Sequence, residues 1–126
     1  MKKILQARFN SFKYAFQGIY TLFATQPNAR IHAFFCLLVI GGGFFFQIST
    51  TEWLVCILAI VMVLSAEAVN TALEFLTDLV SPDYHPLAGK AKDVAAAAVL
   101  ITAFGAVLIG FLVFWSKFWE VVVGYF

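Results

Sequence analysis

Charged residues are scarce in this sequence. Asp, Glu, Lys and Arg make up 12% of the 126 residues, whereas 63% are hydrophobic and the mean hydropathy is +0.93. A soluble domain of this length has too little interior to bury so much apolar surface. The net charge is only +1, without a basic block or an acidic tail, so no nucleic-acid partner is expected. The composition therefore predicts an integral membrane protein that forms one unit over residues 1–126.

Motifs of familiar soluble sites are also missing. Cys36 and Cys56 lie singly in apolar runs, which excludes a CxxC-type zinc site and favours two unpaired thiols packed as small hydrophobic side chains. Gly89-Lys90 lacks the earlier glycine and the following Ser or Thr of a phosphate-binding loop, and no GxGxxG occurs. The glycine triplet 41–43 precedes three phenylalanines, which indicates close helix packing or a kink. Any nucleotide site must therefore be built from other residues.

Apolar periodicity predicts an all-α fold with four helices. Residues 1–30 alternate basic with aromatic and aliphatic side chains, which is typical of an amphipathic helix on the membrane surface. We expect Gly18 and then residues 26–28 to break this helix, and residues 81–89 to form a loop. Transmembrane helices are predicted over residues 31–48, 53–80 and 93–118. His32 is expected to be an interfacial polar residue, with a role in a site as the alternative.

Basic residues are divided unevenly between the two ends of these spans. Seven of the eight Lys and Arg residues belong to the N-terminal segment or to the region 81–93, and only Lys117 lies on the other side. By the positive-inside rule, the N-terminus and that region face the cytoplasm.

Three acids and an amide share one narrow face of the predicted second span. Glu67, Asn70, Glu74 and Asp78 are spaced i, i+3, i+7 and i+11, and Thr71 lies beside them. Carboxylates on one face repel each other, and an ionised one is costly near lipid. Cations that neutralise them make the arrangement tolerable, and Mg²⁺ is the common cation for an all-oxygen site.

The same region supplies what phosphoryl transfer needs. That reaction requires a divalent metal, a cation near the transferring group, and a base or orienting group for the attacking hydroxyl. The acidic face, Asp93 and the nearby Lys90 and Lys92 provide these groups. Two alternatives remain from the residues alone: the acids pair with Lys90 and Lys92 only to hold helix ends together, or they mark the pathway of a small cation- or proton-coupled carrier.

The long motif in the second span resembles a known family. The pattern ExxNTALExxxD over 67–78, followed by Asp83-Tyr84-His85, Lys92-Asp93 and an alanine-rich span, is similar to the prokaryotic diacylglycerol kinase family, which includes undecaprenol kinases. The likeness covers nearly the whole chain. It implies a homotrimer in the bacterial inner membrane, with composite sites shared by neighbouring protomers, that transfers the γ-phosphate of Mg-ATP to the hydroxyl of a membrane lipid alcohol.

The resemblance also implies roles for individual positions. Glu67 matches the residue proposed as the catalytic base, and Glu74 matches a metal-ligating carboxylate. Arg8 lies near a basic residue expected in the N-terminal helix. The positions expected around the nucleotide phosphates and the metal are Asn70, Asp78, Lys92 and Asp93.

This chain departs from the family pattern at Gln26. A glutamate that shares the metal with the position of Glu74 is usual there, and the amide oxygen of Gln26 is expected to act as a metal ligand without contributing charge. Ala95-Ala96 and the segment 26–32 are more similar to the undecaprenol kinase branch. We therefore expect undecaprenol to be favoured over diacylglycerol as the lipid substrate.

Overall fold

The computed structural model describes residues 1–124, which form four helices. These are α1 (Lys2–Thr25), α2 (Pro27–Phe45), α3 (Thr50–Val80) and α4 (Pro86–Val123). The last three are long and apolar enough to cross a membrane, which confirms the number of spans predicted from the sequence. The N-terminal segment is helical as expected, while its position on the membrane surface stays a prediction.

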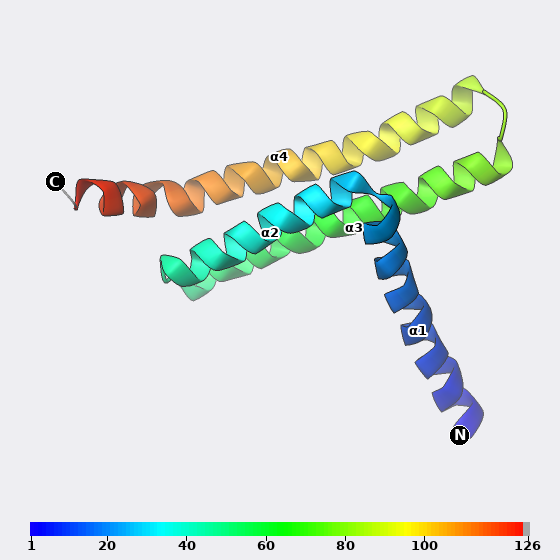
Figure 1. The fold of residues 1–126 in the computed structure, drawn as a ribbon, viewed down its shortest axis with the longest axis horizontal. Coiled ribbons are helices and arrows are strands. Elements are labelled where there is room, and N and C mark those ends of the chain that lie inside the picture. Colours follow the sequence, from blue (N-terminus) through cyan, green and yellow to red (C-terminus); the bar gives the residue numbers. More distant parts are fainter. Residues whose placement is uncertain (125–126) are drawn as a thin grey trace.

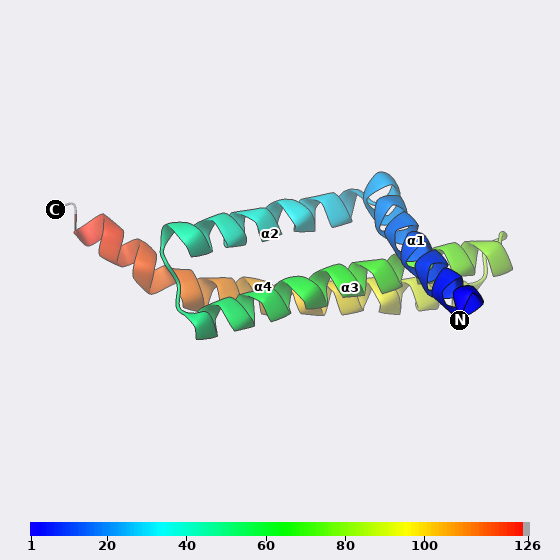
Figure 2. The same cartoon turned by 90° about the horizontal axis from the view of Figure 1, so that it is seen from below.

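The three long helices form an elongated bundle. α3 and α4 run antiparallel and pack against each other extensively, while α2 lies alongside α3 (Figures 1 and 2). α1 projects away from the bundle and touches it only near its junction with α2 (Figure 1). We call the end of the bundle that holds the α1–α2 junction and the α3–α4 loop the loop end. The opposite end, with the α2–α3 connection, is called the turn end.

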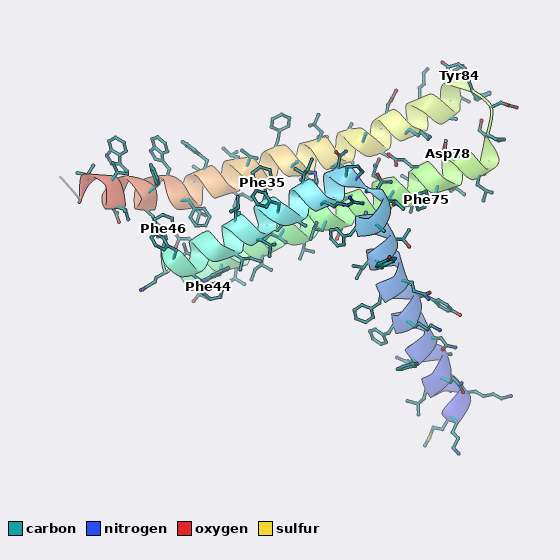
Figure 3. The ribbon with its side chains drawn as sticks, in the orientation of Figure 1. Phe35, Phe44, Phe46, Phe75, Asp78 and Tyr84 are labelled. Carbon is teal, nitrogen blue, oxygen red and sulfur yellow. The ribbon has the colours of Figure 1, made fainter. Side chains whose placement is uncertain are left out.

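Large apolar side chains cover the outside of the bundle. Phe35 and Phe44, for example, are 57% and 73% exposed (Figure 3 labels both). Such a continuous apolar surface is unfavourable in water, whereas the acyl chains of a bilayer solvate it. The exposure therefore supports the assignment of a multi-pass membrane protein.

The turn end holds the compact apolar core. Ile48, Cys56 and Val113 are buried there against each other. Lys117 Nζ lies 3.1 Å from Glu52 Oε1 and links α4 to the first turn of α3. Both cysteines are free thiols, and Cys56 packs as a small hydrophobic side chain, as predicted.

Two predicted breaks differ from the structure. α1 continues through Gly18, because one glycine inside a helix costs only about 1 kcal/mol relative to alanine, less than breaking the helix would cost. The loop before α4 covers only residues 81–85. α4 begins early because Pro86 suits the first helical position, where no backbone N–H is needed, and because His85 Nδ1 accepts a hydrogen bond from the Leu87 N–H.

The other predicted break, over residues 26–28, is confirmed at Gln26 alone, since Pro27 and Asn28 already belong to α2. Gln26 adopts an extended backbone conformation between α1 and α2, and Pro27 starts α2. A residue that precedes proline is disfavoured in the helical region, so the two helices separate at this point. This junction turns the Gln26 side chain toward α3.

Gly43 provides the closest packing in the glycine triplet. A Cβ atom added there would lie 2.6 Å from Trp53 Cη2 and 2.7 Å from Trp53 Cζ2, whereas one added at Gly41 would meet no atom within 4 Å. The triplet therefore serves close packing between α2 and α3, as its sequence context indicated.

Replacing Gly43 and Gly41 in turn separates the effect of close packing on stability from the effect of helix propensity. We expect Gly43→Ala to lower the free energy of unfolding by about 1–3 kcal/mol, because the Trp53 ring must move. Gly41→Ala, the matched control, should be neutral or stabilising by about 0.5–1 kcal/mol. Thermal unfolding in detergent micelles measures both, and equal midpoints for the two variants would contradict this account of the triplet.

Candidate functional site

The buried polar side chains gather on one face of α3. Within residues 1–124 they are Glu67, Asn70 and Thr71, which are 2%, 8% and 5% exposed. The Thr71 hydroxyl donates to the Glu67 carbonyl at 2.9 Å and is thereby satisfied within the helix. Glu67 Oε1 and Asn70 Oδ1, by contrast, have no hydrogen-bond partner among the described residues.

Glu67 faces α2. Its Oε1 atom lies 3.2 Å from His32 Nε2, close enough for an ion pair when the imidazole is protonated. The contact is not a hydrogen bond, and Oε1 has no hydrogen-bond partner among the described residues. One buried carboxylate oxygen is therefore still able to accept a proton or a hydrogen bond, and such an oxygen is rare in a folded protein.

Two amides hold the carboxylate of Glu74. Asn70 Nδ2 donates to Glu74 Oε1 at 3.0 Å, and Gln26 Nε2 donates to Glu74 Oε2 at 3.3 Å. Gln26 comes from the α1–α2 junction, 48 positions away in the sequence. The structure thus brings together three of the residues that the resemblance assigned to the metal and its surroundings.

This arrangement fits a hard cation. In residues 1–124 no group of three or more His, Cys, Asp or Glu side chains gathers, so amides must complete any metal site. Asn70 Oδ1 is buried and has no hydrogen-bond partner among the described residues. Rotating the Gln26 amide would place its oxygen beside Glu74, and Mg²⁺ prefers such oxygen ligands together with water. The donor atoms are therefore compatible with Mg²⁺.

Asp78 and Lys92 form the contact nearest the loop end. Lys92 Nζ donates to Asp78 Oδ1 and joins α3 to α4, and both side chains are partly exposed (Figure 3 labels Asp78). Within residues 1–124, Glu67 and Glu74 form no ion pair with a lysine. The alternative that the acids only pair with lysines to hold helix ends together therefore fits Asp78. It does not explain Glu67 and Glu74.

Two of the predicted site residues lie apart from the others. Arg8 is exposed on α1, which projects away from the bundle (Figure 1). Asp93 is exposed on α4, one position after Lys92, and it forms no ion pair in the described part of the chain. A single chain therefore does not bring either side chain to Glu67 or Glu74.

His32 is the site residue that sequence reasoning placed only at the membrane interface. Gln26 lies opposite Glu74. From Gln26, six residues along α2 cover about 9 Å, and from Glu74, seven residues back along α3 cover about 10 Å. Antiparallel neighbours in this register bring His32 opposite Glu67. The expected pairing of Gln26 with Glu74 would therefore have been enough to predict that His32 lies opposite Glu67.

Comparisons with known proteins identify the family of this chain. The family model described as prokaryotic diacylglycerol kinase matches residues 13–114. The undecaprenol kinase of Bacillus subtilis (strain 168) is 39% identical over 109 residues, which cover 86% of this chain and 89% of that protein. A diacylglycerol kinase of Synechocystis is 44% identical over 101 residues, which cover 79% of this chain and 58% of that protein. The diacylglycerol kinase of Escherichia coli (strain K12) is 28% identical over 105 residues, which cover 83% and 86% of the two chains.

These matches extend over most of the chain and include every residue of the α3 face. The structure adds three apolar helices long enough to cross a membrane and a buried acid on the second of them. The chain belongs to the prokaryotic diacylglycerol kinase family and is an ATP-dependent lipid kinase.

Proposed function

We propose that this protein transfers the γ-phosphate of Mg-ATP to the hydroxyl of undecaprenol at the cytoplasmic face of the bacterial inner membrane. The observation that carries the proposal is the Glu67 carboxylate, which is buried within a span while one of its oxygens has no hydrogen-bond partner among the described residues. An acceptor in that position suits a substrate hydroxyl that arrives from the lipid. The similarity to a protein named undecaprenol kinase supports the choice of alcohol.

Glu67 acts as the general base in this proposal. Its free oxygen accepts the hydroxyl proton as the alcohol oxygen attacks the γ-phosphorus, and the bond between that phosphorus and the bridging oxygen breaks to release ADP. Phosphoryl transfer depends mainly on positioning and charge stabilisation, so the protein needs few reacting groups. A bound Mg²⁺ supplies charge neutralisation on the phosphate oxygens.

The rest of the acidic face binds the nucleotide and its metal. Glu74, the Asn70 carbonyl and the Gln26 amide oxygen provide the donor atoms for the cation. We assign the phosphate contacts nearer the loop end to Lys92, whose contact with Asp78 then has to open or be shared. Asp78 and Asp93 would contact the phosphates through the metal or its water ligands.

A homotrimer completes the site. Arg8 is exposed on a helix that leaves its own bundle, so a neighbouring protomer is the natural source of this positive charge. The basic residues of α1 and of the region before the third span support a cytoplasmic N-terminus. In that orientation the loop end, with its acids, faces the ATP pool.

The polar groups in the bundle argue against a carrier. Glu52 and Lys117 pair at the turn end, and Glu67 lies toward the loop end. Among the described residues of α3 between these two points, the buried side chains are those of Cys56, Ala59 and Val63, and all three are apolar or weakly polar. A coupled carrier needs polar groups across both halves of the membrane, so a reaction at one face accounts better for this distribution.

The direct test offers the purified protein both lipids at once. Undecaprenol and diacylglycerol are mixed in detergent with ATP labelled at the γ-phosphate, and the labelled lipids are separated. When each lipid is supplied alone, we expect both to be labelled. When the two compete, we expect undecaprenol to carry more of the label. Preferential phosphorylation of diacylglycerol would overturn the substrate assignment, and phosphorylation of neither lipid would overturn the proposed function.

Replacing Glu67 tests the base. Glu67→Gln should reduce kcat by about 10²–10⁴-fold while leaving the KM for Mg-ATP nearly unchanged, because the amide cannot accept the hydroxyl proton. Glu120→Gln, on the exposed C-terminal turns of α4, is the matched control and should behave as the parent protein. A loss in Glu67→Gln that is confined to the KM for Mg-ATP would remove the residue from proton transfer.

Changing Glu74 and its partner Gln26 tests the metal site. Glu74→Gln should weaken Mg-ATP binding by at least about tenfold, since it removes the charged oxygen donor. Gln26→Glu should lower the Mg²⁺ concentration needed for half-maximal activity, because it restores a charge beside Glu74. Gln17→Glu makes the same change on the exposed face of α1 and should not alter the Mg²⁺ titration. If Gln26→Glu leaves that titration unchanged, Gln26 is not a metal ligand.

A further inference from the structure

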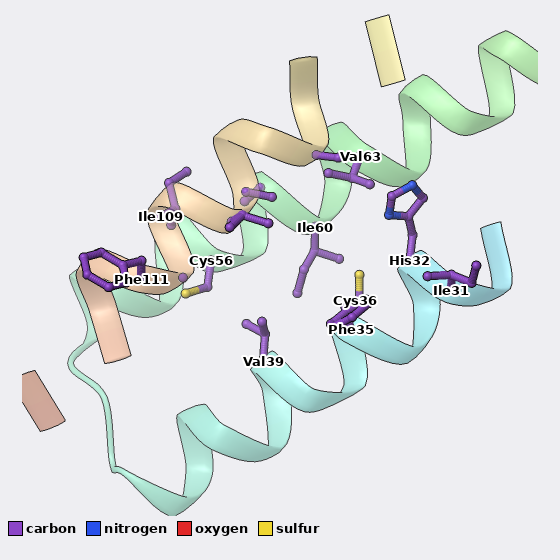
Figure 4. Close-up of a pocket in the computed structure, with 15 residues that line it drawn as sticks. Ile31, His32, Phe35, Cys36, Val39, Cys56, Ile60, Val63, Ile109 and Phe111 are labelled. Carbon is purple, nitrogen blue, oxygen red and sulfur yellow. The ribbon is translucent and has the colours of Figure 1, made fainter. Parts of the chain in front are cut away.

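His32 stands between an apolar cavity and the buried acid. The cavity has a volume of about 310 Å³ and lies between α2, α3 and α4 (Figure 4). Apart from two thiols, His32 contributes the only polar side chain among its lining residues. The imidazole is 22% exposed and points from α2 toward α3, where Glu67 is almost completely buried.

His32 approaches the Glu67 carboxylate from the neighbouring helix. Nε2 lies 3.2 Å from Oε1, and the Gln26–Glu74 hydrogen bond one turn and a half further along fixes the register of α2 on α3. The side chains buried on α4 nearby, Ala95 and Val99, are apolar. The imidazole is therefore the nearest group able to orient Glu67 from a neighbouring helix.

We propose that His32 is a positioning residue for Glu67. The Nε2–H group, 3.2 Å from Oε1, attracts the carboxylate electrostatically and confines it to one rotamer, with Oε1 beside the imidazole that lines the cavity. The assignment rests on the proposed function, in which Glu67 accepts the hydroxyl proton. It requires a donor at the Nε2 position and does not require the imidazole itself to accept a proton.

Two amide variants separate these requirements. The side-chain nitrogen of Gln reaches about as far as Nε2 of His, whereas that of Asn is one methylene shorter. We expect His32→Gln to keep kcat within about threefold of the parent and His32→Asn to lower kcat by about 10–100-fold, the range found when a group that orients a functional residue is lost. The KM for Mg-ATP should change little in either variant. Thr102→Val, which removes a hydroxyl that bonds only to its own helix, is the control for loss of a polar group within a span.

A second measurement links the effect to Glu67. In a Glu67→Asp background the shorter carboxylate no longer reaches His32, so adding His32→Asn should cost less than twofold in kcat, whereas independent effects would multiply. A folding control by size-exclusion chromatography in detergent accompanies each variant.

Each alternative outcome has a defined meaning. Parent-like kcat in both amide variants, or equal losses in both, would overturn the proposal, the second because the imidazole itself would then be required. A loss seen only in the KM for Mg-ATP would overturn it as well. If the parent protein phosphorylates no lipid, the proposed function is wrong. If the parent protein is active and the His32 variants do not behave as expected, only the role of His32 is wrong.

Discussion

The burial of the Glu67 carboxylate is the constraint on which the rest of this structure depends. A carboxylate with 2% of its surface exposed, inside a helix that crosses a membrane, is costly to maintain unless other groups compensate. Here a histidine on α2 approaches one oxygen, and two turns away a pair of amides holds Glu74. The break at Gln26 and the position of α2 on α3 place these groups opposite one another.

The bundle divides its tasks between its ends. The turn end is held by the apolar cluster around Cys56, by the ring of Trp53 over Gly43 and by the Glu52–Lys117 pair. The loop end buries smaller apolar side chains such as Ala29 and Ala95, and beside them it holds the unsatisfied oxygens of Glu67 and Asn70. Packing at one end thus supports an arrangement at the other end that is poor for stability. Unsatisfied buried groups of this kind are typical of sites that await a ligand.

Much of this could be predicted from the sequence, for physical reasons that also set the limit. Apolar run lengths predicted the three spans, and helical spacing placed Glu67, Asn70 and Glu74 on one face. The break at Gln26 followed from the proline after it. The early start of α4 was missed, because a cap by His85 depends on a local hydrogen bond that composition does not report. His32 was placed at the interface because its role depends on the register between two helices, and the position of Arg8 depends on neighbouring protomers, which one chain does not contain.

The most direct test of the account locates the divalent cation. Fe²⁺ replaces Mg²⁺ together with a non-hydrolysable ATP analogue, ascorbate and peroxide generate hydroxyl radicals at the metal, and mass spectrometry maps where the backbone is cut. The account predicts cuts in α3 around Glu74 and at the α1–α2 junction around Gln26, both suppressed by excess Mg²⁺. Cuts confined to other parts of the chain, such as the turn end near Glu52, would contradict it.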